Sequence, residues 1–392
     1  MRNKLIKYKQ EHLIEYYNSL TELDKLKFER EINSIDFDLM QELFVNCNKI
    51  NKTNYFKPVI PISKSDFSDI THYEGIGENV VNSGEFALIT LAGGQGTRLG
   101  CNYPKGKFML DGKSLFEYMA EKIKETNTYW LVMTSNDNHE ETIDFFFENN
   151  NFGIKNVDFF TQGDLPLIDV NGKIVLDSNG IKFASSGNGD IYKSLVRSGQ
   201  LKKLKEKNIK YLFVNNVDNI LSNPLDYFAI GLLKEEKTPL LCKSIKKAYD
   251  SEKVGVYCYK NGNPGVVEYT EVTDKMLKCV DEDGNFLYNN ANISANYLTV
   301  DLIEEISNHN LEFHAAFKKS SYLDENLKLI NPIKENVFKF ESFIFDGFRY
   351  AKDFIVLDSK RNEEFAPIKN SDEIGVDCPK TALELYKKNY YK

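Results

Sequence analysis

One stretch near residue 90 constrains the fold more than any other part of the sequence. The run FALITLAGG (86–94) is apolar and ends in glycines, and KSLFEYMAEKIKET (113–126) after it has helical spacing, which predicts a strand, a loop and a helix. The same texture recurs in YWLVMTSND (129–137), ETIDFFFENN (141–150), VDFFTQGD (157–164) and YLFVNNVDN (211–219). Short buried strands that alternate with helices indicate an α/β fold with a mostly parallel sheet.

The segment before this region is predicted to be helical. Apolar residues fall near one helical face at Leu5, Tyr8, His12, Tyr16 and Leu20. Thr21 with Asp24 resembles a helix start, and Asp36 is expected to cap a third helix. The stretch KPVIPISKSDFSD (57–69) contains two prolines and cannot continue a helix, so we expect a strap that leads into the main domain.

Toward the C-terminus the predicted elements become shorter. The helical pattern LTVDLIEEISNH (298–309) leads to FESFIFDGF, FIVLDS and EEFAPIKN, which mix strand and turn signals. We therefore expect three parts: an N-terminal helical segment (1–80), a central α/β domain (81–335) and a small C-terminal α+β domain (336–392).

Composition limits the classes of ligand. The chain has 392 residues, 42% of them hydrophobic, which is enough for a sizeable core. Its 50 Lys and Arg against 58 Asp and Glu leave a net charge of -8. This charge argues against a protein that coats nucleic acid or lies on an anionic membrane, so an anionic ligand must be bound at a local site.

The cysteines and the hydrophobic runs bear on the compartment. The six cysteines lie far apart, with no CxxC pair and no Cys/His cluster at zinc-finger spacing: Cys47, Cys101, Cys242, Cys258, Cys279 and Cys378. The basic start MRNKLIKYKQEHLIEYY lacks the apolar core of a signal peptide, and no run approaches the ~20 residues of a membrane span. We expect reduced thiols and a soluble, cytoplasmic protein.

The glycine loop suits phosphate, because glycines let backbone N–H groups approach a ligand and a helix N-terminus adds positive charge. Two familiar phosphate loops do not match. The pattern GxGxxxG (94–100) is one residue longer than the dinucleotide fingerprint. A Walker loop ending at Gly106-Lys107 would also be one residue too long, with Phe108 where Ser or Thr should bind magnesium. Hydride transfer and P-loop ATP hydrolysis are therefore disfavoured.

What remains is LAGGQGTRLGCNYPKG (91–106), in which the glycines are interleaved with Arg98 and Lys105. A glycine-rich turn alone is more often plain structure. All sixteen residues, however, are similar to the signature of the UDP-sugar pyrophosphorylase (UDPGP type 1) family, most closely its UDP-N-acetylglucosamine branch. Further segments recur in the family's order along nearly the whole chain: QEHLIEYYNSL, YWLVMTS, FFTQG, SSGNGDIY, VDNIL, VVEYTE, NANISANY, FESFIFD and EEFAPIKN.

The resemblance implies a fold, a reaction and a cofactor. The fold is a Rossmann-like (GT-A-like) nucleotidyltransferase domain with helical N-terminal and smaller C-terminal flanks. The reaction is that of UTP with N-acetylglucosamine 1-phosphate, giving UDP-N-acetylglucosamine and pyrophosphate. Both reactants are anions, so cations and Mg²⁺ must stand between them while the sugar phosphate attacks the α-phosphorus in line.

The resemblance also assigns residues to the nucleotide and the metal. The backbone of Leu91, Ala92, Gly93 and Gly94 would hold UTP, with Arg98 and Lys105 as the catalytic cations, Gln162 and Gly187 at uracil, and Lys339 at the phosphates. Asp218, which follows the apolar strand YLFVNNV, is the expected magnesium ligand, because carboxylates at the carboxyl ends of strands open onto the ligand crevice of α/β sheets. Asp346 is a weaker candidate for a second ligand.

For the sugar phosphate the resemblance implies Asn188, Glu268, Tyr269, Asn292 and Lys369. Asn292 would read the hexose or its acetamido group. The sequence departs from the family at Ala291, where Gly precedes that Asn, and at Asp190, where a second Gly often follows GNG. Extra bulk there would bear on the identity of the sugar more than on the reaction.

Three alternatives follow from the same residues. Glucose 1-phosphate or N-acetylgalactosamine 1-phosphate is the near rival as substrate. A glycosyltransferase on a similar fold generally carries a DxD metal motif, whereas the strand end here is VDN. A UDP-sugar-binding protein without catalytic activity is disfavoured by the presence of Arg98, Lys105 and Asp218.

Overall fold

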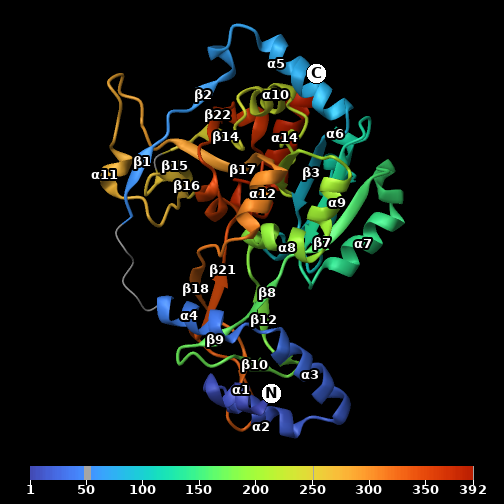
Figure 1. Cartoon of the computed structure of the whole chain (residues 1–392), viewed down its shortest axis with the longest axis vertical. Helices are drawn as coiled ribbons and strands as arrows, with labels where there is room; N and C mark the ends of the chain where they lie inside the picture. Colours follow the sequence, from blue (N-terminus) through green and yellow to red (C-terminus); the bar gives the residue numbers. More distant parts are fainter. Residues whose placement is uncertain (48–53, 250, 392) are drawn as a thin grey trace. The chain divides into compact units, whose positions relative to one another are not determined.

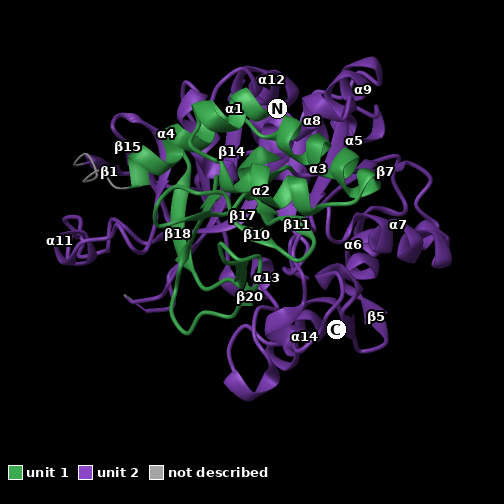
Figure 2. Cartoon of the chain, turned by 90° about the horizontal axis from the view of Figure 1, so that it is seen from below, with its two compact units in different colours: residues 1–53, 163–190, 311–343 green, residues 54–162, 191–310, 344–392 purple. Residues whose placement is uncertain are grey.

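The computed structural model describes residues 1–47, 54–249 and 251–391, and Figure 1 labels its elements along the chain. The chain divides into two compact units, coloured in Figure 2. Unit 1 comprises 1–53, 163–190 and 311–343, and unit 2 comprises 54–162, 191–310 and 344–392. This division differs from the three consecutive parts expected from the sequence. Strand pairing between distant stretches explains the difference, since β9 (Ile168–Asp169) pairs with β21 (Val337–Glu341) in unit 1.

The described residues of unit 2 form one mixed sheet of eleven strands. Its main path runs β2-β22-β14-β17-β13-β3-β6-β7, and β15 pairs with β1, β16 and β17 beside it. The strands are β1 (Phe56–Pro58), β2 (Ile62–Ser63), β3 (Phe86–Leu91), β6 (Tyr129–Thr134), β7 (Val157–Thr161), β13 (Tyr211–Asn216), β14 (Leu240–Lys246), β15 (Val256–Lys260), β16 (Asn263–Val267), β17 (Asn290–Thr299) and β22 (Ile355–Asp358). Neighbours from β13 through β3 and β6 to β7 are parallel, whereas β17 is antiparallel to β13 and β14. The predicted α/β class with a mostly parallel sheet is confirmed.

The central strands are apolar runs because they are buried on both faces. Every residue of β3 and β6 is buried, which is typical of parallel strands covered by helices. The helices of unit 2 include α5 (Ile70–Asn82), α6 (Leu115–Ile123), α7 (His139–Glu148), α8 (Ile191–Arg197), α9 (Gln200–Glu206), α10 (Tyr227–Glu235), α11 (Asp274–Leu277), α12 (Val300–Ser307), α13 (Arg361–Glu364) and α14 (Pro379–Tyr390). Phe116, Trp130, Phe146 and Phe213 belong to one core cluster and are fully buried. Burial of each such side chain contributes roughly 1.5–3 kcal/mol.

Unit 1 packs N-terminal helices against short strands. Its helices are α1 (Arg2–Lys7), α2 (His12–Ser19), α3 (Glu22–Ser34) and α4 (Phe37–Cys47). Its strands are β8 (Asp164–Pro166), β9, β10 (Leu176–Asp177), β11 (Gly180–Ile181), β12 (Phe183–Ser185), β18 (His314–Lys318), β19 (Tyr322–Leu323), β20 (Leu329–Ile330) and β21. The predicted caps are confirmed, because the Thr21 side chain accepts from Asp24 N–H and Asp36 Oδ1 accepts from Leu39 N–H (3.0 Å).

The structure differs from the sequence expectation in one further place and adds detail in another. The apolar spacing from Leu5 to Leu20 does not lie on one helix, because the chain breaks between α1 and α2, where Lys9 has a positive φ of 57°. The proline-containing strap is not helical at its prolines, as expected, and it contains two short strands that the sequence did not indicate. It forms β1, which pairs with β15, and β2, which pairs with β22 at the end of the main path. Such positions tolerate proline, which cannot donate to a ladder.

All six cysteines lie in the described residues and are free, with Cys242, Cys258 and Cys378 buried. No helix in the part of the chain that the structure describes is long and apolar enough to cross a membrane.

Candidate active site

The glycine loop after β3 folds back on itself. Its first N–H, that of Ala92, donates to the end of β6 (2.7 Å). Further along, the N–H of Lys105 donates to the carbonyl of Gly94 (3.1 Å), which closes the loop. Two 3₁₀ turns, η2 (Thr97–Leu99) and η3 (Lys105–Lys107), carry the predicted cations. The loop is thus a compact turn at the carboxyl end of a buried strand, with Gly96 and Gly106 buried and Gly94 and Arg98 exposed.

The helix expected directly after this loop begins later. A hairpin of β4 (Met109–Leu110) and β5 (Lys113–Ser114) intervenes, and α6 starts at Leu115 with Ser114 as its N-cap. The positive charge within the loop is therefore that of its arginine and lysine side chains rather than that of a helix N-terminus.

Asn138, which the sequence did not single out, fastens the loop to β6. Its side chain is 1% exposed, and its Nδ2 donates to Ala92 O (3.0 Å) and Gly94 O (3.5 Å). Its Oδ1 accepts from Ser135 N–H (2.8 Å). One end of the amide therefore holds the backbone of the glycine loop, and the other end holds the residue that follows β6.

Gln162, predicted to read uracil, lies against the same loop. It follows β7, is 5% exposed, and its backbone N–H donates to Thr134 O (2.8 Å). A Cβ atom on Gly93 would lie only 2.3 Å from Gln162 Nε2. The glycine therefore makes room for the amide, and the two predicted nucleotide residues are in direct contact.

Lys105 and Asp218 form an ion pair, with Nζ and Oδ2 2.7 Å apart. Their side chains are 16% and 14% exposed, so the pair is largely shielded but can be reached. Arg98, in contrast, is exposed on η2 and forms no ion pair within the described residues. The structure thus brings the expected metal ligand and one expected catalytic cation together at the glycine loop.

The chain after β13 is joined to a C-terminal segment that carries Lys369. Ile368 N–H donates to Asp218 O (2.9 Å). Asn219 uses both ends of its amide, since Nδ2 donates to Glu364 O (2.8 Å) and Oδ1 accepts from Ala366 N–H (2.9 Å). These three bonds fix residues 364–368 beside the metal-ligand candidate. Asn219 is a second residue that the sequence did not single out.

Lys369 directly follows these hydrogen-bonded residues, which we call the C-terminal ladder (364–368), and it lies next to an acidic residue. Its N–H donates to Asp377 O (2.7 Å) and its Nζ lies 5.6 Å from the centre of the Phe365 ring. Burial raises the pKa of Asp377, the charge of Lys369 opposes that shift, and Asp218 adds to it. Lys369 and Asp218 are therefore both close enough to Asp377 to affect its charge.

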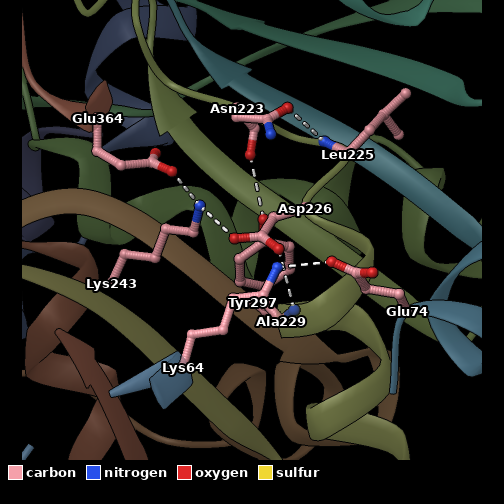
Figure 3. Close-up of polar contacts among 9 residues, drawn as sticks. All are labelled: Lys64, Glu74, Asn223, Leu225, Asp226, Ala229, Lys243, Tyr297 and Glu364. Atoms are coloured by element: carbon pink, nitrogen blue, oxygen red, sulfur yellow. Dashed lines mark hydrogen bonds and ion pairs between the residues drawn. The ribbon is translucent and has the colours of Figure 1, made fainter. Parts of the chain in front are cut away.

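Glu364 of this segment also belongs to a buried charged network (Figure 3). Lys243 of β14 is fully buried and contacts the carboxylates of Asp226 (2.7 Å) and Glu364. Burial alone would lower the pKa of Lys243, but these two charges raise it well above its usual value. Lys122 of α6 donates to Ile220 O (2.6 Å) and to the carbonyl of Ser222, in the loop that follows Asn219.

We expect the free energy of unfolding of the wild type to rise relative to that of Lys122→Met as the pH increases from about 7 to 9. Burial lowers the pKa of Lys122 to about 7. The unfolded chain therefore binds more protons than the folded chain between pH 7 and the ordinary lysine value of about 10.4, and stability rises with pH on the order of 1 kcal/mol per unit. Urea unfolding at several pH values measures the difference. Lys124→Met, at the exposed lysine directly after the helix, should show no such trend, and parallel profiles for all three proteins would contradict a neutral Lys122.

Two predicted sugar residues meet around Gly255. Asn292 N–H donates to Gly255 O (2.8 Å). A Cβ on Gly255 would lie 2.9 Å from Glu268 Oε1, so the absence of a side chain makes space for that carboxylate. Tyr269, after β16, is 48% exposed. Three residues before Gly255, Glu252 pairs with Arg361, which connects this region to the C-terminal segment.

Ala291 does not project beside Asn292. It is fully buried and belongs to the main core cluster, and neighbouring residues of a strand point to opposite faces. The methyl group that replaces the family's glycine is therefore accommodated in the core.

Unit 1 carries the remaining predicted residues. Gly187 has φ 89°, and a Cβ there would lie 2.2 Å from Ser342 O, so the turn before Asn188 requires glycine. Asp190, at the second departure from the family, accepts from Gly163 N–H (2.5 Å). Lys339 on β21 pairs with Glu341 (2.8 Å).

All other predicted site residues lie in unit 2, including Asp346 in η6 (Ile344–Tyr350). No cluster of three or more His, Cys, Asp and Glu side chains suited to a metal ion occurs among the described residues. Asp218 therefore offers a single hard oxygen ligand group beside the glycine loop.

Comparison with known proteins identifies the family. A family model described as UTP–glucose-1-phosphate uridylyltransferase (UDPGP) matches residues 36–391. The chain is 34% identical over 351 residues to human UDP-N-acetylhexosamine pyrophosphorylase-like protein 1, which covers 84% of this chain and 69% of that protein. It is 32% identical over 381 residues to UDP-N-acetylglucosamine pyrophosphorylase of Saccharomyces cerevisiae, covering 91% and 79%.

A solved structure gives the same result. The uridine diphosphate N-acetylglucosamine pyrophosphorylase of Trypanosoma brucei, crystallised with an inhibitor, superposes with a TM-score of 0.83 at 30% identity, over 98% of this chain and 83% of that one. The chain therefore belongs to the UTP–glucose-1-phosphate uridylyltransferase family, as its glycine loop indicated.

Proposed function

We propose that this chain is a magnesium-dependent uridylyltransferase that forms UDP-N-acetylglucosamine and pyrophosphate from UTP and N-acetylglucosamine 1-phosphate. The observation that carries the proposal is the Lys105–Asp218 pair at the glycine loop, in a chain of this family. A cation and a metal-binding carboxylate beside backbone N–H groups suit a triphosphate.

The reaction needs alignment and positive charge rather than a nucleophilic side chain. A phosphate oxygen of the sugar 1-phosphate attacks the α-phosphorus of UTP, and the bond from that phosphorus to the pyrophosphate oxygen breaks. Arg98 and Lys105 offset the negative charge of the triphosphate as the bond to pyrophosphate breaks. Lys339 is assigned to the UTP phosphates and Lys369 to the sugar phosphate.

Nucleotide recognition is assigned to the loop and to two amide or glycine positions. The backbone of residues 91–94 holds the nucleotide, and Gln162 offers the donor and acceptor that a uracil edge requires. Its contact with Gly93 supports this assignment, because both would face one ligand. Gly187 is assigned to uracil by the resemblance to the family.

The sugar is assigned to the residues around Gly255 and to Asn188. Glu268 accepts hydrogen bonds from ring hydroxyls, Tyr269 packs beside them, and Asn292 recognises the group at carbon 2. Because the Ala291 methyl is buried in the core, this departure from the family is no obstacle to an acetamido group.

Magnesium fits the donor at Asp218. The ion prefers hard oxygen ligands and keeps most of its coordination for water and phosphate, so one or two carboxylates suffice. Bound there, it would supply further positive charge to the phosphates, and Lys105 would exchange its carboxylate contact for a phosphate contact. Asp346 remains the candidate for a second ligand.

We expect the purified protein, given UTP, Mg²⁺ and a panel of hexose 1-phosphates, to release pyrophosphate fastest with the N-acetylglucosamine compound. Chelation of the metal should abolish the release and added Mg²⁺ should restore it. Faster turnover of glucose 1-phosphate or N-acetylgalactosamine 1-phosphate would correct the sugar. Binding of UTP without turnover of any sugar would favour a non-catalytic UDP-sugar-binding protein, and transfer from a UDP-sugar to an acceptor would favour a glycosyltransferase.

A further inference from the structure

A buried hydroxyl group lies behind the sugar residues assigned above. Tyr257 on β15 is fully buried, and its hydroxyl is 2.8 Å from Asn292 Oδ1 and 3.1 Å from Asn296 Oδ1. A phenolic hydroxyl has one hydrogen to donate, and the shorter contact is with Asn292. The Tyr257 hydroxyl therefore donates to the side-chain oxygen of Asn292.

A second donor reaches the same oxygen. Ser294 N–H donates to Asn292 Oδ1 (2.9 Å). Ser294 has a φ of 54°, in the left-handed region that non-glycine residues seldom occupy, and this conformation occurs just where its N–H bonds to the Asn292 side chain. Rotating the amide by 180° would place its NH₂ group against the Ser294 N–H, which can only donate, and would force the Tyr257 hydroxyl to change from donor to acceptor. The orientation of the Asn292 amide is thus fixed by its neighbours.

The other end of the amide is left for a ligand. Nδ2 of Asn292 makes no hydrogen bond with the described part of the chain, whereas its Oδ1 makes two. The residue's backbone N–H is bonded to Gly255, against which the Glu268 carboxylate lies. Asn292 therefore presents a donor, and not an acceptor, at the place assigned to the sugar.

We propose that Tyr257 is a positioning residue that makes the enzyme discriminate N-acetylated from non-acetylated sugars, by holding the Asn292 amide with its NH₂ group toward the acetamide carbonyl of the ligand. This inference rests on the proposed function. A carbonyl oxygen only accepts a hydrogen bond, so it requires a donor in that place. A hydroxyl at the same carbon both donates and accepts, so it tolerates either orientation of the amide.

Affinity for the two nucleotide sugars tests the inference without requiring turnover. Titration calorimetry with UDP-N-acetylglucosamine and with UDP-glucose is performed on the wild type, Tyr257→Phe and Tyr259→Phe. Tyr259 lies two residues along the same strand, and its hydroxyl donates to Asp353 (2.9 Å), so it is the matched control. Tyr257→Phe should weaken UDP-N-acetylglucosamine about fivefold to tenfold, the scale of one hydrogen bond, and UDP-glucose less than twofold. The control should change neither.

Equal weakening of both ligands, or of neither, by Tyr257→Phe would overturn the inference. Asn292→Asp gives a second measurement, because a carboxylate keeps both acceptor contacts but has no donor for the ligand. It should lower the preference for the acetylated ligand at least as much, and an unchanged preference would also overturn the inference. Absence of pyrophosphate release by the wild type would instead count against the proposed function, so the two failures are distinguishable.

Discussion

Lys105→Ala is expected to lower the rate of pyrophosphate release by roughly a hundredfold or more, with the fold unchanged. Removal of one charge contact to a transition state has effects on this scale. The side chain is 16% exposed and already held next to Asp218, so its charge is positioned before the substrate arrives. Lys107→Ala is the matched control. It lies two residues on in the same 3₁₀ turn but pairs with Glu141, and it should retain the wild-type rate.

Asp218→Ala should cause a loss of similar size, and the double variant shows whether the two residues act as a unit. If both act on the same phosphates, the losses will not add, as is usual for groups in contact. Steady-state rates at saturating Mg²⁺, with melting curves for each variant, provide the measurement. Wild-type rates in a folded Lys105→Ala or Asp218→Ala protein would refute the role given to that residue.

Lys243→Met is expected to destabilise the protein by about 3 kcal/mol or more. The substitution leaves Asp226 and Glu364 close together in a buried site without their cation, and breaking a buried ion pair costs far more than breaking an exposed one. Burial raises the pKa of Glu364 even with Lys243 present, so its charge is already unfavourable there. The midpoint of thermal unfolding should fall by several degrees.

Lys64→Met is the control for this change. Lys64 lies near the same network in Figure 3, but its pair with Glu74 is 45% and 43% exposed. Exposed pairs contribute about 0–1 kcal/mol, so the control should unfold close to the wild-type midpoint. Equal midpoints for Lys243→Met and the wild type would mean that the buried charges do not hold the C-terminal segment.

The local features of the fold were readable from the sequence because they depend on neighbouring residues. The runs that became β3 and β6 are apolar, and a fully buried strand must be, whereas β7 and β13 are buried only in part. Thr21 was recognisable as a helix cap because its partner, Asp24, is three residues away. The sequence also placed Lys105 and Asp218 in motifs of one site, although 113 residues separate them.

The residues that support the site could not be found in this way. Lys243 meets Glu364 across 121 residues, and Tyr257 meets Asn292 across 35, so no local spacing reveals either contact. Asn138 and Asn219 look like ordinary loop asparagines until their amide contacts are known. The division into two units was hidden for the same reason, since each unit gathers stretches that the sequence keeps far apart.

The ladder between Asn219 and residues 364–368 also sets the order in which a newly synthesised chain can complete its site. The glycine loop and Asp218 leave the ribosome while Glu364 has not yet been translated. Until it appears, Lys243 lacks one of its two carboxylate partners, and the segment bearing Lys369 is missing. Chains generally acquire structure from the N-terminus during synthesis. Here the nucleotide loop can form early, whereas the cation assigned to the sugar phosphate arrives only with the last translated residues.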